Sequence, residues 1–84
     1  MRTPIIAGNW KMHKTIAEAT TLVREMRREL NAIKGVEKVL CPTFTALSAV
    51  ADLIRGIDIK LGAQNMHWEE QGAFTGEISP LMLK

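Results

Sequence analysis

Between residues 15 and 35, apolar side chains recur at spacings of three and four, which is the pattern of an amphipathic helix with one buried face. The apolar positions are Ile16, Ala19, Leu22, Val23, Met26, Leu30 and Ile33. Thr15 and Glu18 stand at the spacing of a capping box, in which each side chain accepts a hydrogen bond from the backbone amide of the other. Gly35 stands where a left-handed residue commonly ends a helix. The pattern therefore predicts a helix of about five turns, with Gly35 as its C-cap.

Three shorter segments have the composition of strands. Residues 4–11 are β-branched and small, residues 38–41 form a short apolar run, and residues 57–64 alternate between apolar and polar side chains. Pro42 ends the second of these strands, because proline donates no hydrogen bond to a ladder. A second helix is predicted from Thr45 to Arg55, with Gly56 as its stop. Strands that alternate with helices predict parallel pairing and right-handed crossovers.

After the third predicted strand, residues 65–78 show no period and are interrupted by glycines, so we expect a long loop. Ser79 followed by Pro80 is typical of a helix start, and residues 81–84 would form the first turn of that helix. We therefore expect an α/β fold in the order β-α-β-α-β-loop-α, with residues 1–84 as a single incomplete domain. Because two crossover helices of one hand cover one face of such a sheet, the other face and both edges are expected to lie open.

The composition is that of an ordinary soluble globular chain and argues against several classes of protein. Of the 84 residues, 46% are hydrophobic and 24% are charged, and no run approaches the roughly 18 consecutive apolar residues of a membrane span. The N-terminus lacks the apolar stretch and cleavage site of a secretory signal. Cys41 is the only cysteine and has no internal disulfide partner, which suits a reducing compartment. We therefore expect a cytoplasmic protein with no membrane partner.

The net charge of +2 arises from 11 basic and 9 acidic residues that are dispersed along the chain. The one basic cluster, Arg24, Arg27 and Arg28, is interrupted by Glu25 and Glu29, as on a solvated helix face. A nucleic-acid surface requires an uninterrupted basic stripe with stacking aromatic residues. No nucleic-acid partner is therefore expected.

Asn9 and Lys11 are the first candidates for chemistry. Alternation along a strand places both side chains on one side, at the C-terminal end of the first predicted strand. In parallel α/β folds, ligands bind at that end. An ammonium beside a carboxamide suits a phosphate or a developing oxyanion, because it supplies a positive charge and a directed donor. A lysine at a strand end is more commonly solvated, so the spacing alone leaves both interpretations open.

The histidines and the cysteine favour a structural interpretation over a metal site. His13, His67 and Cys41 lack the spacing of metal ligands. We predict surface or interface histidines, an inert buried thiol and no metal.

The loop 65–78 also carries carboxylates and aromatic rings. Glu69, Glu70 and Glu77 are open to an acid–base role, but solvated or interface carboxylates are favoured in a polar loop. Trp68 and Phe74 fit either a ligand-stacking platform or an apolar anchor in a partner's pocket.

Four segments together resemble the triosephosphate isomerase family. Residues 8–12, Gly-Asn-Trp-Lys-Met, are similar to the family's signature for its first strand and loop. Residues 41–48 are similar to the start of its second helix, residues 62–65 to its third strand, and residues 72–80 to its third loop. These matches follow the family's order and spacing. The resemblance implies the βαβαβ portion of a (β/α)8 barrel with parallel strands, truncated at the start of the third helix and covering about the first third of the family's chain.

The resemblance also implies roles for particular residues. Asn9 and Lys11 would bind the substrate, and Lys11 would be the catalytic cation that neutralises charge on the phosphate and on the enediolate. Gln64 would lie in a second layer beneath them. Thr75 would reach from the loop into a neighbouring subunit and support that subunit's Asn9 and Lys11. The other residues implied at the homodimer interface are Met12, His13, Asn65, Phe74, Gly76 and Glu77.

For the intact enzyme, the resemblance implies interconversion of dihydroxyacetone phosphate and D-glyceraldehyde 3-phosphate, in glycolysis and gluconeogenesis, without metal or organic cofactor. The family's catalytic histidine and glutamate lie beyond these segments, so the 84-residue chain alone is expected to be inactive. The C-terminal portion of the barrel, and a second copy docked through the loop 65–78, are the implied partners. Two alternatives are a non-catalytic βα module that associates with itself or with a complementary fragment, and a phosphate-binding piece of another barrel.

Overall fold

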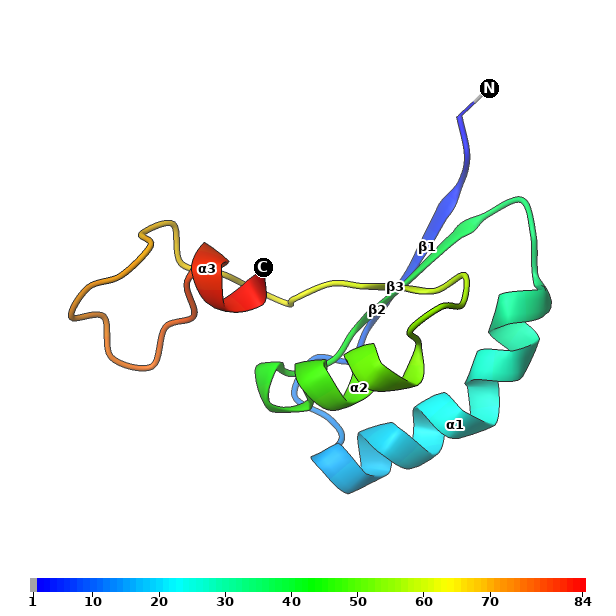
Figure 1. Cartoon of the computed structure of the whole chain (residues 1–84), viewed down its shortest axis with the longest axis horizontal. Coiled ribbons are helices and arrows are strands. Elements are labelled where there is room, and N and C mark those ends of the chain that lie inside the picture. Colours follow the sequence, from blue (N-terminus) through cyan, green and yellow to red (C-terminus); the bar gives the residue numbers. More distant parts are fainter. Residues whose placement is uncertain (1) are drawn as a thin grey trace.

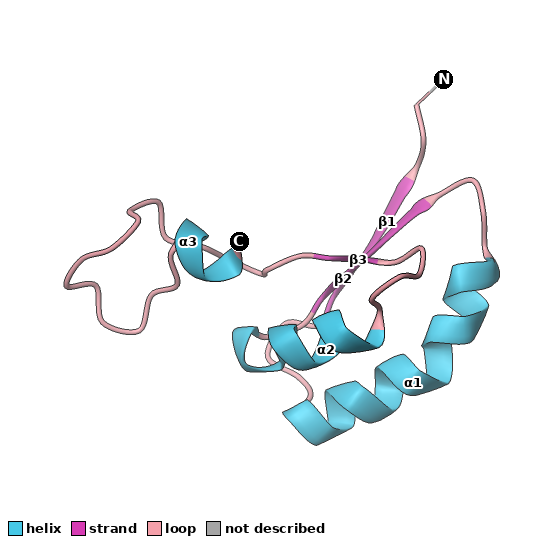
Figure 2. Ribbon diagram, in the orientation of Figure 1, coloured by secondary structure: helices cyan, strands magenta, loops and turns pink. Residues whose placement is uncertain are grey.

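The computed structural model describes residues 2–84 and contains a three-stranded parallel sheet, two helices packed on it, and a loop that leads to a third, short helix (Figure 1). α1 and α2 lie side by side on the sheet, whereas the loop and α3 extend away from it (Figure 2). The predicted order of elements is confirmed. In chain order the elements are β1 (Ile5–Asn9), α1 (Ile16–Ala32), β2 (Glu37–Cys41), the 3-10 turn η1 (Phe44–Ala46), α2 (Leu47–Leu53), β3 (Lys60–Leu61) and α3 (Pro80–Leu83).

The strands lie in the order β1-β2-β3, and both neighbouring pairs are parallel. β1 and β2 pair along their whole length, so that Asn9 lies opposite Cys41 at the carboxyl end. β3 pairs with β2 through two residues, with Leu40 opposite Leu61. Because the carboxyl ends of parallel strands meet at one edge, the residues that follow β1, β2 and β3 are brought together there. The predicted parallel βαβαβ arrangement is confirmed.

The core lies where α1 and α2 pack against each other and against the sheet. Val23 of α1 and Val50 of α2 are fully buried, and burying an apolar side chain of this size contributes about 1.5–3 kcal/mol relative to leaving it exposed. β1 has no such cover, since Ile5 and Ile6 are 60% and 63% exposed. The open apolar surface that the element order predicts is therefore present at β1. The buried apolar cluster consists of Ala19, Val23, Leu40, Ala46, Val50, Ile54 and Ile59.

α1 begins as predicted but ends earlier. Thr15 Oγ1 accepts from the Glu18 amide at 3.3 Å, and Glu18 Oε1 accepts from the Thr15 amide at 2.9 Å, so the predicted capping box is confirmed. The pKa of the Glu18 carboxyl is held below its usual value, mainly by the hydrogen bond from the Thr15 backbone and next by the Thr15 side chain. The helix ends at Ala32, and its cap is Ile33 in an extended conformation. Gly35 as the C-cap is therefore wrong; its left-handed φ of 87° serves the turn to β2.

The remaining elements are shorter than their patterns predict. β1 ends at residue 9 rather than 11, because the chain turns there toward α1. The helix predicted from residue 45 to 55 is divided into η1 and α2 and ends before the left-handed Gly56, whose φ is 78°. Only two residues of the predicted strand 57–64 pair, because the Ile57 amide is bonded to the Ile54 carbonyl in a turn. Beyond β3, the Gly62 amide donates to the Leu40 carbonyl at 2.9 Å.

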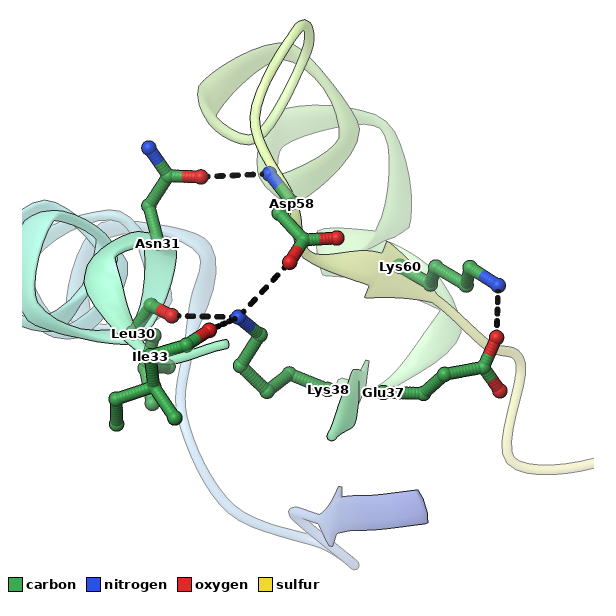
Figure 3. Close-up of polar contacts among 7 residues, drawn as sticks. All are labelled: Leu30, Asn31, Ile33, Glu37, Lys38, Asp58 and Lys60. Carbon is green, nitrogen blue, oxygen red and sulfur yellow. Dashed lines mark hydrogen bonds and ion pairs between the residues drawn. The ribbon is translucent and has the colours of Figure 1, made fainter. Parts of the chain in front are cut away.

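At the amino end of the sheet, one buried lysine joins three segments of the chain (Figure 3). Nζ of Lys38, a residue of β2 that is 5% exposed, donates to the carbonyls of Leu30, at 2.8 Å, and Ile33 and to Asp58 Oδ2, at 3.1 Å. Asn31 Oδ1 accepts from the Asp58 amide at 2.7 Å. The hydrogen bond and the charge of Lys38 hold the pKa of the Asp58 carboxyl below its usual value. We call these five residues the Lys38 cluster; the sequence pattern did not predict it.

Candidate functional site

A cavity of about 540 Å³ opens where the chain leaves β1 and β3 at their carboxyl ends. It brings together Asn9 and Lys11, for which the resemblance implies substrate binding, and Gln64, which the resemblance places in a second layer beneath them. A neighbouring hollow of about 470 Å³ between α2, β3 and α3 is lined mostly by apolar side chains and holds no ionisable group. The residues that line the first cavity are Asn9, Lys11, Met12, Thr43, Phe44, Leu47, Ala63, Gln64, Asn65, Ile78 and Leu83.

Asn9 and Lys11 reach the same cavity through a turn, not through strand alternation. β1 ends at Asn9, and Lys11 adopts a left-handed conformation with φ of 54°. Asn9 Oδ1 accepts a hydrogen bond from the Lys11 amide at 2.9 Å, which ties the two residues together. The expectation of a strand extending to residue 11 is therefore wrong, although the two side chains do share one cavity. A non-glycine residue with positive φ carries local strain, and such residues cluster at functional sites.

Gln64 supports this turn from the end of β3. Its Nε2 donates to the carbonyl of Lys11 at 2.9 Å and to the carbonyl of Cys41 at 2.9 Å. The side chain therefore bridges the loop after β1 to the last residue of β2, across separations of 53 and 23 residues. This places Gln64 directly behind Lys11, in contact with its main chain.

The carbonyl of Cys41 completes the support and was missed by sequence reasoning. It accepts from the Trp10 amide at 3.1 Å as well as from Gln64 Nε2, so one oxygen joins the ends of all three strands. A Cβ atom at Gly62 would lie 3.0 Å from Cys41 Sγ, so the absence of a side chain there permits the close approach. A backbone carbonyl has no signature in the sequence. The only available signal was Pro42, which marks where the ladder of β2 must end.

Lys11 is the only residue with an ionisable side chain among those that line the cavity. Lys11 and Asn9 are both exposed, so a dissolved ligand has access to them. Because Asn9 Oδ1 is held by the Lys11 amide, the Asn9 side chain is oriented and keeps its Nδ2 amino group as a donor. Together they supply one positive charge and a directed hydrogen bond. That combination is chemically suited to an anion, and neither of these two groups is a carboxylate or imidazole base.

The other residues implied at an interface lie in three places. Met12 and Asn65 line the cavity, and Met12 is 91% exposed. His13 is exposed and lies outside the cavity lining. The remaining four lie in the exposed loop between β3 and α3, away from Lys11; they are Phe74, Thr75, Gly76 and Glu77.

The loop between β3 and α3 is held by its own contacts. The ring of His67 lies 4.3 Å from the rings of both Trp68 and Phe74, measured between centroids. The His67 amide donates to the Ile78 carbonyl at 2.8 Å, which closes the loop at its base. In residues 2–84, no three His, Cys, Asp or Glu side chains are grouped as metal ligands. None of the helices described is long and apolar enough to cross a bilayer.

Comparison with known proteins gives the same family throughout. The sequence model of the family described as triosephosphate isomerase matches residues 4–84. Curated triosephosphate isomerases of Dehalococcoides mccartyi strain BAV1 and Clostridium perfringens strain SM101 are 56% and 61% identical over 84 residues. All of this chain is covered, but only 33% and 34% of the length of these relatives.

A solved structure agrees with the sequence relatives. The crystal structure of triosephosphate isomerase from Bartonella henselae superposes with a TM-score of 0.88 and 38% identity, over 98% of this chain and 33% of the other. The chain thus spans about one third of the length of the relatives that it matches, and it corresponds to their N-terminal portion. With the same parallel sheet and a family match across nearly its whole length, this chain belongs to the triosephosphate isomerase family.

Proposed function

We propose that this chain supplies the substrate-binding corner of a triosephosphate isomerase, which interconverts dihydroxyacetone phosphate and D-glyceraldehyde 3-phosphate. The observation that carries the proposal is that Asn9 and Lys11 share one cavity and are tied to each other and to Gln64. Family membership supports the choice of a triose phosphate over other anions. The cavity needs neither a metal nor an organic cofactor to bind such an anion.

Lys11 and Asn9 have distinct tasks in this proposal. The ammonium group of Lys11 neutralises charge on the substrate's phosphate and on the enediolate that forms when a proton leaves the carbon next to the carbonyl. Nδ2 of Asn9 donates a hydrogen bond to an anionic oxygen in the same cavity. Because Gln64 holds the Lys11 carbonyl, the Lys11 backbone is positioned before the ligand arrives. Removing one such electrostatic group typically costs about 10²- to 10³-fold in kcat.

The chain alone is expected to show no isomerase activity. Proton abstraction needs a general base, and no carboxylate or imidazole lines the cavity among the described residues. The family resemblance puts the catalytic histidine and glutamate in the part of the relatives that follows the matched third. Loss of general acid–base catalysis by itself forfeits roughly 10²- to 10⁴-fold in rate.

A chimera tests the proposal. The chain replaces the matched third of the Clostridium perfringens enzyme, to which it is 61% identical, and isomerase activity is measured beside that of the isolated 84-residue chain. We expect an active chimera and an isolated chain at the level of the buffer blank. Lys11→Ala in the chimera is expected to lower kcat about 10²- to 10³-fold. A folded chimera that is inactive, or one that is unaffected by Lys11→Ala, contradicts the proposal.

The open surface at β1 favours a second candidate function, a structural module that associates with a complementary fragment or with itself. Ile5 and Ile6 are more than half exposed, and the outer edge of β1 is unpaired within residues 2–84. The two candidates are separated by mixing this chain with the separately produced remainder of the Clostridium perfringens enzyme. Restored activity favours the enzyme portion, whereas a defined but inactive complex favours the module.

We further propose a cytoplasmic homodimer as the assembled state and glycolysis and gluconeogenesis as its setting. The exposed apolar side chains of the loop between β3 and α3, with Trp68 79% and Phe74 48% exposed, support a protein partner for that loop. Sedimentation of the chimera measures the oligomeric state, and a monomer with full activity contradicts the dimer proposal.

A further inference from the structure

The Lys38 cluster lies outside the cavity and takes no part in the proposed chemistry. Within residues 2–84, Lys38 is the one charged residue that is buried. Burial alternates along β2, with Lys38 and Leu40 buried and Glu37, Val39 and Cys41 half-buried. Lys38 therefore occupies a core-facing position at which the strand pattern calls for an apolar side chain. An ammonium ion in such a position is costly unless its donors are satisfied.

All three donors of this ammonium are satisfied, by three separate points of the chain. The carbonyl of Leu30 belongs to the last turn of α1, that of Ile33 to its cap residue, and Asp58 to the turn between α2 and β3. The last turn of α1 contains no basic residue of its own. Lys38 therefore supplies the positive charge that the carbonyl end of a helix favours, and supplies it from the neighbouring strand.

The second ion pair on the sheet shows what is particular about this arrangement. Lys60 Nζ lies 2.6 Å from Glu37 Oε1, a shorter distance than that from Lys38 to Asp58. The difference lies in the lysines: Lys60 is 63% exposed and its ammonium contacts only one segment, whereas Lys38 is 5% exposed and bonds two carbonyls besides Asp58. The carboxylates are alike, since Glu37 is 40% and Asp58 55% exposed. An exposed pair of this kind contributes little to stability.

We propose that Lys38 is a conformational clasp that makes the end of α1, the start of β2 and the α2–β3 turn open and close as one unit. Asn31 belongs to the same unit, because its side chain reaches from the last turn of α1 and accepts a hydrogen bond from the Asp58 amide. Opening any of the three segments requires Lys38 to lose an acceptor while its stem remains buried. The clasp therefore joins Lys38 to residues 5 and 8 positions earlier, at the end of α1, and to one 20 positions later, in the α2–β3 turn.

Amide hydrogen exchange of the 84-residue chain tests the clasp. Lys38→Met keeps an unbranched apolar side chain at this buried position of β2 but removes the ammonium group. The reporting amides are those of Ile33, Glu37 and Asp58, which donate to Leu30, Pro4 and Asn31. We expect Lys38→Met to speed exchange at all three about tenfold or more, and the matched control Lys60→Met to change it less than about twofold. Unchanged exchange in Lys38→Met, or equal acceleration by Lys60→Met, overturns the proposal.

A second variant keeps the proposal testable if Lys38→Met does not fold. Asp58→Asn retains the shape of the side chain and leaves Lys38 its two carbonyl acceptors. We expect it to speed exchange at the same three amides by a smaller factor, about threefold, because only the charge of one acceptor is lost. Exchange in Asp58→Asn that matches the unaltered chain at all three amides overturns the clasp, whatever the behaviour of Lys38→Met.

Discussion

Lys11 and Lys38 lie at opposite ends of one sheet, and their ammonium groups differ in exposure and in hydrogen bonding. Lys11 follows β1 at the carboxyl end, is exposed, and is held through its backbone by Asn9 and Gln64. Lys38 lies at the amino end, is 5% exposed, and has its ammonium group bonded by three acceptors. Where the protein holds the main chain, the charged side chain stays exposed to the cavity. Where it holds the ammonium itself, as at Lys38, the charge serves to join the end of α1 to the α2–β3 turn.

Removing the charge of Lys11 and removing that of Lys38 are expected to give the largest effects, one on kcat and the other on stability. In the chimera, Lys11→Ala is expected to lower kcat about 10²- to 10³-fold with little change in Tm, because alanine keeps the same strained φ. Lys38→Met is expected to leave kcat of the folded protein unchanged and to lower the free energy of unfolding by about 2 kcal/mol. Steady-state kinetics and thermal unfolding of both variants measure this. A loss of kcat in Lys38→Met would show that the two ends are not independent.

Lys14 provides the matched control at the carboxyl end. It also has a positive φ, of 77°, and is exposed, but it does not line the cavity of Asn9 and Lys11. Lys14→Ala is therefore expected to leave kcat within about twofold. Equal losses from Lys14→Ala and Lys11→Ala would point to general charge rather than to the cavity.

Gln64 sharpens the comparison at the carboxyl end. Gln64→Met keeps the length of the side chain but removes both hydrogen bonds to the carbonyls of Lys11 and Cys41. Because it acts through the position of Lys11, we expect kcat to fall about tenfold with little change in KM. Glu29→Met, on the exposed face of α1, serves as the control and is expected to be neutral. A rise in KM alone would indicate direct contact with the substrate instead of positioning.

The two ends of α1 offer a smaller contrast. Its start is capped locally by Thr15, whereas its end is capped from β2 by Lys38. Thr15→Ala is expected to lower the free energy of unfolding by about 1 kcal/mol, because the Glu18 amide loses its side-chain acceptor. Thr21→Ala, at an exposed position within the helix, is the control. Chemical denaturation compares them, and equal stability of the two variants would argue against the cap.

The smallest expected effect is the response to acid at the amino end. The hydrogen bond and charge of Lys38 lower the pKa of Asp58 below its ordinary value of 3.8. A depressed pKa contributes stability that is present above the ordinary value and is lost as the pH falls through the folded-state pKa. Asp58→Asn should therefore flatten the pH dependence of stability below about pH 4. Asp52→Asn, which removes an exposed partner of Arg55, is the control, and an equal flattening would contradict the assignment.

The sequence predicted best those features that depend on nearby residues, such as the spacing of apolar side chains and the capping of a helix. The apolar spacing and the capping box located α1, and the alternation of elements implied the parallel sheet with one covered face. The family resemblance pointed to Asn9, Lys11 and Gln64, which do meet at one cavity.

The features that were missed depend on partners far away in the chain. The left-handed turn at Lys11 is supported by Gln64, 53 residues later. The central acceptor of the site is a backbone oxygen of Cys41, which any residue could supply. Lys38 looked like one end of an apolar strand, because its carboxylate partner is 20 residues away and its other acceptors are carbonyls. Strand length at β3 likewise depends on which neighbours are paired.

The left-handed backbone at Lys11 implies that the residue best for stability differs from the one that the proposed activity needs. Glycine adopts a φ of 54° without the clash that a Cβ atom causes, so Lys11→Gly should relieve about 1 kcal/mol of strain. A mutant library of the chimera selected only for soluble expression would then enrich glycine at this position, whereas one selected for isomerase activity would restore lysine. At Lys14, which has the same backbone hand but no place in the cavity, both selections would accept glycine.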